Sequence, residues 1–249
     1  MDIENQYGTL EIQKSLLALL RSFHNFCQEN NVKYSLVYGS LLGAIRHQGF
    51  IPWDDDVDVI VYRDEFQKIV DCVNNSDLEM VYRTDESLWL PRVIYKGKEH
   101  ETGNRPLIDI FILDKVPNSW LLSRFKYFSI MLIQGMIKSH PPVSRLSISW
   151  KILSVGSWLM GRFFTRKFKY KMFDVVAKIG DKGNSGYLHS YNTIFPYRKH
   201  TIRKELISSY TTVPFDGIEV SIMSGYDEFL TTLYGDYMTP PDEKKPKHR

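Results

Sequence analysis

Apolar residues recur at three- and four-residue steps near the start of the chain, which predicts an amphipathic helix. The helix is expected to end at the polar stretch from Glu29 to Asn31. Its apolar positions are Ile12, Leu16, Leu19, Leu20, Phe23, Phe26 and Cys27. The next segment, "VKYSLVYG", predicts a buried strand, and "SLLGAIRHQG" predicts a short helix that Ser40 caps and Gly49 ends.

The apolar periodicity changes to two after Asp56 and predicts a strand. Val57, Val59 and Val61 share one face of this strand, while Asp56 and Asp58 share the other. A helix is predicted over 63–73, and strands are predicted within 78–84, 90–97 and 106–114. The first 114 residues are therefore expected to form a compact unit of helices and strands.

The pattern is mainly helical through the middle of the chain and returns to strands near its end. A hairpin is predicted over 210–223, with Asp216-Gly217 as its turn, followed by a helix near "YDEFLTTLYG". We divide the chain into a catalytic core, 1–114, a basic helical region, 115–180, and a C-terminal region, 181–249, that packs on the core.

Composition places the chain among ordinary globular proteins. It has 249 residues, of which 43% are hydrophobic and 24% charged, and this excludes disordered and fibrous classes. The acidic N-terminus lacks the pattern of a secretory signal, and no stretch reaches the ~20 apolar residues of a spanning helix. Cys27 and Cys72 are expected to be buried thiols rather than a disulfide framework. A cytoplasmic location is therefore expected.

Charge is distributed unevenly along the chain. Residues 1–114 carry 19 acids and 11 Lys+Arg, residues 115–173 carry 11 Lys+Arg and no acid, and residues 174–249 carry ten of each. The basic middle fits three interpretations: a helical region with a solvated cationic face, peripheral contact with the inner face of the cytoplasmic membrane, or nucleic-acid binding. Because no nucleic-acid-binding motif accompanies the charge, no specific nucleic-acid partner is expected.

The aspartates at the start of the second predicted strand suggest a metal site. Asp56 and Asp58 lie two residues apart on one face, so their Cα atoms are roughly 6.6 Å apart and their carboxylates can converge. Two carboxylates that share a partly buried site repel each other unless a proton or a cation lies between them. Oxygen ligands of this kind suit Mg²⁺ or Mn²⁺, and Mg²⁺ is commonly shared with substrate phosphates.

Two further features extend this site. Gly39-Ser40 opens a predicted helix, where backbone N–H groups and the helix dipole favour a phosphate. Asp109 interrupts the apolar stretch "LIDIFIL" and is the expected third metal ligand, since an isolated carboxylate there is costly unless it is paired or metal-bound. A solvated turn with capping aspartates is the structural alternative.

A Gly-Ser turn that opens a helix, an Asp-x-Asp strand and a later strand aspartate resemble the nucleotidyltransferase superfamily that includes DNA polymerase β. More narrowly, "YGSLLGAIRHQGFIPWDDDVDV" resembles the signature of the LicD family, to which fukutin-like proteins are related. "IDIFILD" and "FLTTLYGDYMTPP" resemble later motifs of that family. The resemblance implies an α+β fold with a nucleotidyltransferase-like mixed sheet, flanking helices and an additional mainly helical region.

The resemblance also implies an activity. Members of the family transfer a phospho-alcohol, typically phosphocholine, from a CDP-linked donor to a sugar hydroxyl of a cell-surface polysaccharide or lipid-linked glycan, and release CMP. Asp56, Asp58 and Asp109 would hold the metal ions, and Gly39 and Ser40 would bind phosphate. The alternatives are an enzyme that attacks an NTP and releases pyrophosphate, and a non-catalytic glycan- or membrane-binding protein.

Several other residues are candidates for the site. Arg46 would contact the phosphates or stabilise transition-state charge, with a surface ion pair as the alternative. Asp54 would act as the general base or support a metal ligand. Tyr234, Asp236 and His248 would line the donor or acceptor pocket, whereas Gly235 in the same motif also suits a plain helix C-cap.

Overall fold

A computed structural model describes residues 7–82, 90–97, 105–138, 140–141, 148–180, 183, 185–192 and 201–240. The chain divides into two compact units. Unit 1 comprises Met1–Val81, Arg92–Phe111 and Glu205–Arg249, and unit 2 comprises Tyr82–Pro91 and Ile112–Lys204. The mixed α+β class is confirmed, while the polymerase β-type arrangement and the three-part domain division stay predictions.

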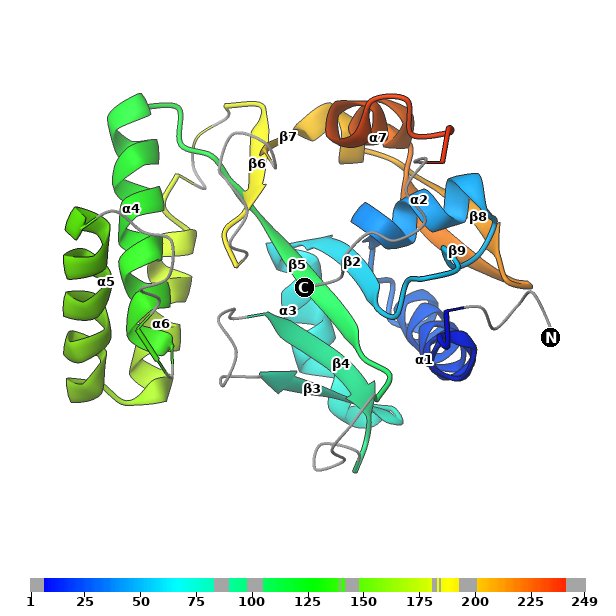
Figure 1. The fold of residues 1–249 in the computed structure, drawn as a ribbon, viewed down its shortest axis with the longest axis horizontal. Helices are drawn as coiled ribbons and strands as arrows, with labels where there is room; N and C mark the ends of the chain where they lie inside the picture. Colours follow the sequence, from blue (N-terminus) through cyan, green and yellow to red (C-terminus); the bar gives the residue numbers. More distant parts are fainter. Residues whose placement is uncertain are drawn as a thin grey trace. The chain divides into compact units, whose positions relative to one another are not determined.

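Unit 1 is built on a sheet with helices around it (Figure 1). The strands follow the order β1-β2-β5-β4-β3, and β1–β2 and β4–β5 pair antiparallel. Its elements are α1 (Leu10–Glu29), β1 (Ser35–Leu36), α2 (Tyr38–Arg46), β2 (Val57–Tyr62), α3 (Arg63–Cys72), β3 (Leu78–Tyr82), β4 (Pro91–Tyr95), the first half of β5 (Ile108–Lys115), β8 (Tyr210–Phe215), β9 (Ile218–Met223) and α7 (Tyr226–Tyr234). These elements confirm the helices and strands predicted for 1–114.

Helix α1 supplies much of the core of unit 1. All seven of its predicted apolar positions are buried, because steps of three and four residues place them along one stripe of the helix. Cys27 belongs to this stripe and its thiol is buried, whereas Cys72 is only partly buried; both are free thiols. The burial expected for the cysteines therefore holds fully for Cys27 alone.

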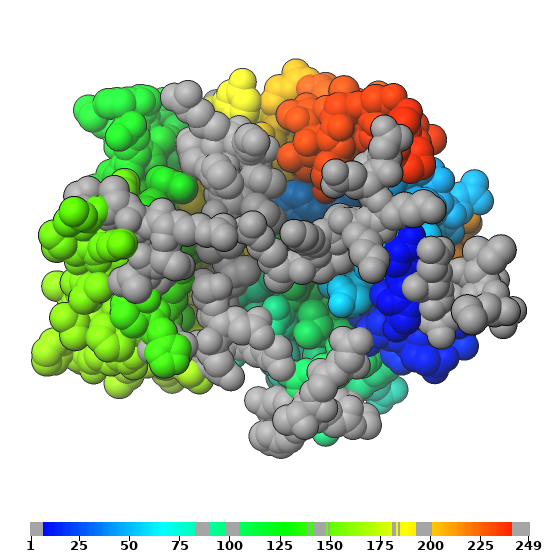
Figure 2. Space-filling model, in the orientation of Figure 1, coloured from blue at the N-terminus to red at the C-terminus, as the bar shows by residue number. Residues whose placement is uncertain are grey.

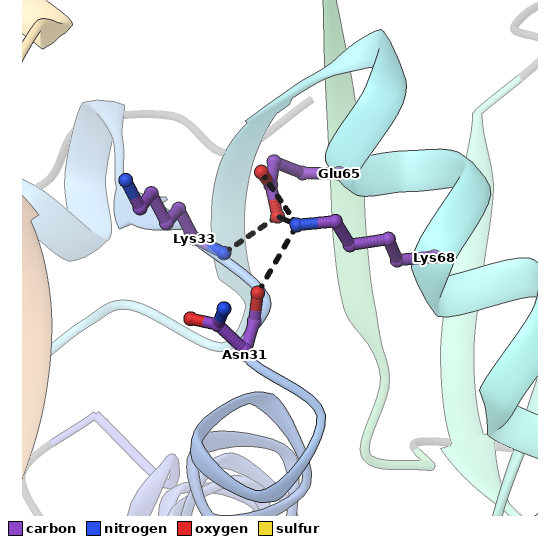
Figure 3. A network of polar contacts seen from close by, with 4 residues as sticks. All are labelled: Asn31, Lys33, Glu65 and Lys68. Carbon is purple, nitrogen blue, oxygen red and sulfur yellow. Dashed lines mark hydrogen bonds and ion pairs between the residues drawn. The ribbon is translucent and has the colours of Figure 1, made fainter.

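A network of polar contacts joins the end of α1 to α3 (Figure 3). The backbone N–H of Lys33 donates to Glu65 Oε2 at 2.9 Å, and Lys68 Nζ donates to the Asn31 carbonyl at 3.2 Å and to Glu65 Oε1 at 3.0 Å. Asn31 has a φ of 51°, which lets the chain reverse sharply after α1. The contacts hold this turn beside α3, although exposed ion pairs contribute only about 0–1 kcal/mol each.

The start of α2 differs from its prediction. The helix begins at Tyr38, with Val37 as its N-cap, and Ser40 lies inside the first turn rather than at the cap. The prediction was wrong because the strand before it is short: β1 contains only Ser35 and Leu36, so the helix is capped three residues earlier, at Val37. The helix also ends at Arg46 and not at Gly49.

The predicted hairpin is confirmed as β8 and β9, which pair antiparallel from Tyr210–Met223 to Phe215–Ile218. Asp216 and Gly217 form its turn with φ angles of 45° and 80°, as expected for an Asp-Gly turn between twisted strands. The carboxylate of Asp216 accepts the backbone N–H of Phe50 at 3.0 Å, so the turn is attached to the loop that follows α2.

Unit 2 confirms the predicted helical middle. It contains α4 (Trp120–Ile137), α5 (Ile148–Met160), α6 (Arg166–Ala177), β6 (Tyr187–Ser190) and β7 (Thr201–Arg203), together with the second half of β5. The sequence did not predict β6 and β7, which continue the antiparallel pairing from β5. The core cluster of this unit consists of Ile130, Ile133, Phe173, Ala177 and Tyr191.

A fully buried lysine lies beside this cluster. Lys126 Nζ donates to the carbonyls of Lys115 at 2.8 Å and Ile179 at 3.0 Å, and it lies 4.2 Å from the centre of the Tyr191 ring. These partners offset the cost of burying the ammonium group. Within the described residues, no helix is both long and apolar enough to cross a bilayer.

Close packing of α2 leads to a stability prediction. A Cβ at Gly43 would lie 2.5 Å from the Gly49 carbonyl oxygen, a backbone atom that cannot move away easily. We expect Gly43→Ala to lower the free energy of unfolding by about 1–3 kcal/mol in urea denaturation. Gly156→Ala is the matched control, because the Gly156 Cβ position in α5 is open and alanine favours helices. Equal stability of the two variants would contradict the close contact.

Candidate active site

Two neighbouring elements of unit 1, α2 and β2, meet at Ser40. The Ser40 side chain is buried, and its Oγ accepts the backbone N–H of Asp58 at 2.9 Å. The backbone N–H of Val37 donates to the Asp58 carbonyl at 3.1 Å. Ser40 therefore fixes the position of Asp58 relative to the first turn of α2.

Asp54 lies against this same turn. A Cβ at Gly39 would be only 2.8 Å from Asp54 Oδ2, so glycine is what allows the carboxylate to approach the helix backbone. From α1, Gln13 Nε2 donates to the carbonyls of Ile51 at 3.0 Å and Asp54 at 2.8 Å, which holds the loop in place. The Asp54 side chain is buried.

Asp109 joins the cluster from the adjacent strand, since β5 is the neighbour of β2 in the sheet. Its Oδ1 accepts from Arg92 Nε at 2.5 Å, and Arg92 lies directly opposite on β4. Both side chains are largely buried, with 11% and 13% exposed. A charge-assisted hydrogen bond in this setting is strong and fixes the direction of the carboxylate.

Burial and the charges of neighbouring aspartates raise the pKa values of Asp58 and Asp54. Burial first, and then the charges of Asp56, Asp109 and Asp54, raise the pKa of Asp58 well above its ordinary value, while Arg92 opposes the rise. Burial, followed by Asp56 and Asp55, raises the pKa of Asp54 to about 8. The excess of negative charge is therefore not neutralised by the protein alone.

Two tyrosines face this cluster. Burial and then the charges of Asp58, Asp54 and Asp56 raise the pKa of Tyr234 to about 12. Tyr234 ends α7, which lies beside α2 (Figure 1), and its side chain is partly exposed. Tyr38 is buried, and burial followed by Asp58 raises its pKa as well.

Tyr38 opens α2 with an unusual backbone. Its φ is 50°, a left-handed conformation that costs a bulky residue roughly 1–2 kcal/mol. Its ring packs edge-on against Phe111, with centroids 5.0 Å apart. Strain of this kind concentrates at functional sites. Tyr38 and Arg92 were not predicted from the sequence. For Arg92, the available signal was the alternation of side chains along β4, which places Arg92 opposite Asp109 when β4 pairs with β5.

Two further predicted site residues make hydrogen bonds within the protein. Arg46 Nη1 donates to the Tyr237 carbonyl at 3.0 Å, and Arg46 Nε donates to His47 Nε2 at 3.0 Å. Asp236 Oδ2 accepts from Thr239 Oγ1 at 2.7 Å. Their predicted contacts with substrate stay predictions.

The remaining residues near the predicted site are Gly235, Asp55 and His248. Gly235 is the C-cap of α7, with a φ of 70°, which agrees with the plain capping interpretation. Asp55 is exposed, and its charge contributes to the raised pKa of Asp54. His248 lies outside the described residues.

The carboxylates suit a divalent cation by chemistry and by charge. Asp56, Asp58 and Asp109 offer only oxygen donors, the kind that Mg²⁺ and Mn²⁺ prefer. A cation would relieve the repulsion that raises the pKa of Asp58. No three acidic, His or Cys side chains among the described residues already form a complete metal-binding group. The donor set therefore fits a divalent metal in its chemistry and its charge.

Comparison with known proteins places the chain in a family. A family model described as "LicD/FKTN/FKRP, nucleotidyltransferase domain" matches residues 31–129, the segment that contains all four aspartates. The chain is 30% identical to a Haemophilus influenzae protein named lipopolysaccharide cholinephosphotransferase LicD, over 96% of this chain and 95% of that protein. An uncharacterized Rickettsia prowazekii protein is 35% identical over 47% of this chain and 38% of its own length. This chain belongs to the LicD family, as the resemblance implied.

The raised pKa of Asp54 leads to a prediction about stability and pH. A carboxyl whose pKa is about 8 in the fold and near 3.9 when unfolded destabilises the fold increasingly as pH rises between these values. We expect Asp54→Asn to raise the free energy of unfolding by about 1–3 kcal/mol at pH 8 without metal, and by progressively less toward pH 5.

Urea denaturation with EDTA at both pH values measures this difference. Asp71→Asn is the control, because Asp71 is exposed on α3 and is not among the charges that raise the pKa of Asp54, so its change should have little effect at either pH. A stabilisation of the Asp54→Asn protein that does not depend on pH would contradict the proposed cause.

Proposed function

We propose that this protein transfers phosphocholine from a CDP-linked donor to a sugar hydroxyl of lipopolysaccharide or a related cell-surface or lipid-linked glycan, and releases CMP. One observation carries the proposal: carboxylates from β2, β5 and the loop before β2 gather beside the first turn of α2, in a chain of the LicD family. The relative named as a lipopolysaccharide cholinephosphotransferase supports the choice of substrate.

Asp56, Asp58 and Asp109 are the residues we assign to hold Mg²⁺ or Mn²⁺. When bound, such ions supply positive charge that stabilises a donor diphosphate and the oxygens entering and leaving phosphorus. Ser40 supports this assignment because it fixes the backbone of Asp58. Arg92 acts similarly on Asp109, whose carboxylate it orients through a short hydrogen bond.

Asp54 is the group best suited to accept a proton. A pKa of about 8 leaves a carboxylate basic enough to take a proton from a hydroxyl while it is still partly ionised near neutral pH. In the proposed reaction the acceptor oxygen bonds to the phosphorus of phosphocholine, and the bond from that phosphorus to the bridging oxygen breaks. CMP leaves with the electron pair, and the acceptor proton passes to Asp54.

The donor is proposed to lie between the first turn of α2 and the end of α7. Gly39 and Ser40 would contact its phosphates, as the free N–H groups of a helix start favour anions. Tyr234 is a partly exposed aromatic ring close to the acids, which suits contact with the quaternary ammonium of choline. Arg46, Asp236 and His248 are proposed to border the donor or acceptor further out.

A nucleotidyl transfer is the second candidate, because the matching family model is described as a nucleotidyltransferase domain. The same carboxylates would serve either reaction, since both are displacements at phosphorus. The products distinguish them: phosphocholine transfer releases CMP, whereas attack on an NTP releases pyrophosphate.

Substitution of single carboxylates tests the assignment. We expect Asp58→Asn and Asp109→Asn to lower kcat for CMP release from CDP-choline by about 10²–10³-fold or more, because each loses charge where the transferring phosphoryl group is stabilised. Asp71→Asn should keep near wild-type activity, as its side chain is exposed on α3 and does not act on the site carboxylates. The measurement follows CMP with a lipopolysaccharide acceptor. Unchanged turnover in the Asp58→Asn protein would refute the site.

Metal binding can be measured without turnover. Millimolar Mg²⁺ should raise the Tm of the wild-type protein by about 2–6 °C at pH 8, because it neutralises mutually repelling carboxylates and binds only the folded state. EDTA should reverse this rise, and the Asp58→Asn variant should show little of it. A rise of the same size in that variant would place the ion elsewhere.

A further inference from the structure

Helix α4 of unit 2 has an outward face that is unusually apolar. Its buried stripe contains Ser123, Lys126, Ile130, Ile133 and Met136, at three- and four-residue spacing. The opposite side of its first half also carries large apolar side chains, and these are exposed: Trp120, Leu121, Leu122, Phe125 and Phe128. A helix that is apolar on both sides is expected to be covered rather than solvated.

Helix α5 adds to this face. It lies beside α4 and runs in the same direction (Figure 1). The two helices approach closely near their C-terminal ends, where a Cβ at Gly135 would lie within 2.2 Å of Ser157 Oγ and one at Gly161 would lie 2.3 Å from the Met136 carbonyl. The N-terminal halves of both helices are therefore neighbours, and Ile148, Trp150 and Ile152 are exposed there.

We call the exposed residues Trp120, Leu121, Phe125, Phe128, Ile148 and Ile152 the apolar face. Exposed fractions reach 66% for Trp120, 71% for Leu121 and 78% for Ile148. Figure 2 shows α4, α5 and α6, in green to yellow-green, at the surface of this unit. Exposed apolar residues are common singly, but several large ones on two packed helices indicate an interaction surface.

The two helices that carry the apolar face, α4 and α5, contain no acidic residue. Residues 115–173 contain 11 Lys+Arg and no acid. Arg124, Lys151 and Lys178 are exposed, and Lys178 lines a pocket together with Leu122 at the start of α4. Arg162, Arg166 and Lys167 are also exposed but lie at the far ends of α5 and α6. Arg124 lies 5.0 Å from the Trp120 ring centre and Arg162 lies 4.4 Å from the Trp158 ring centre. Paired tryptophan and arginine suit a boundary between water and apolar material.

We propose that unit 2 docks onto an anionic lipid bilayer through the apolar face, with the surrounding cations at the lipid phosphates. Apolar side chains flanked by Lys and Arg are the combination that binds peripheral helices to anionic membranes. A second copy of the chain would bring cations against cations and is disfavoured. Nucleic acid would satisfy the charge but would leave the aliphatic side chains exposed to water.

Co-flotation with vesicles tests the docking. The probe is a vesicle of phosphatidylethanolamine and phosphatidylglycerol, and the comparison is a phosphatidylcholine vesicle with free phosphocholine added, so that any choline-binding site does not contribute. We expect binding to the anionic vesicle that is at least tenfold tighter and that weakens as salt is raised. Equal binding to both vesicles, or none to the anionic one, would overturn the proposal.

Two sets of variants separate the apolar and ionic parts. Trp120→Ser with Ile148→Ser should weaken vesicle binding at least tenfold, because both side chains lose apolar burial in the bilayer. Arg124→Gln, Lys151→Gln and Lys178→Gln together should weaken it by about fivefold for each cation. The control removes equally exposed cations of unit 1 with Lys14→Gln, Arg21→Gln and Lys33→Gln, and should bind normally.

Other occupants give different results. If the serine variant abolishes a dimer seen by analytical ultracentrifugation without lipid, the face is an interface between two copies and the proposal fails. It also fails if duplex DNA binds more tightly than the anionic vesicle. Since soluble CDP-choline turnover does not use this face, all variants should keep CMP release, so failure of docking and failure of the proposed activity are distinguishable.

Discussion

The arrangement of the candidate site in unit 1 depends on one interaction, the repulsion among partly buried carboxylates. Burial and then the charges of Asp56, Asp109 and Asp54 raise the pKa of Asp58, and burial followed by Asp56 and Asp55 raises that of Asp54. The fold sustains this cost through specific supports. Gly39 leaves room for one carboxylate, Ser40 fixes the backbone of another, and Arg92 orients a third. A metal ion bound with the donor phosphate would remove this repulsion, and its binding would be stronger for that reason. An arrangement that destabilises the free protein therefore suits the proposed reaction.

The elements that bring the carboxylates together are distant in sequence. Asp58 stands on β2 and Asp109 on β5, and they approach because these strands are neighbours in the sheet. Tyr234 reaches the same cluster from α7, nearly two hundred residues beyond α2. Hydrogen bonds from Gln13 and the left-handed start at Tyr38 hold the intervening loops. These contacts position the backbone around the site, and fixed groups favour electrostatic stabilisation of a transition state.

Unit 2 satisfies a different constraint. Its helices pack around a small core that contains Phe173 and Tyr191, yet α4 and α5 leave large apolar side chains exposed and carry cations but no acid. The ammonium group of Lys126 is buried in this unit because backbone carbonyl groups accept its hydrogen bonds. The outer cations have water or a partner instead. An anionic bilayer provides an apolar medium for the exposed apolar residues and negative charge for the cations. Docking would therefore account for both features, which are unfavourable when the surface faces only water.

The sequence by itself determined the local elements and the chemistry of the site. Periodicity located α1, β2, α3 and the β8–β9 hairpin because helix and strand geometry fix which residues share a face. Motifs around Gly39, Asp56 and Asp109 indicated the family because their order along the chain is itself the signature. Only the tertiary structure decided where α2 begins, that Arg92 is bound to Asp109, and that Arg46 is bound to the Tyr237 carbonyl. These contacts join residues far apart in the chain, and no local pattern encodes which distant partner the packing will bring near.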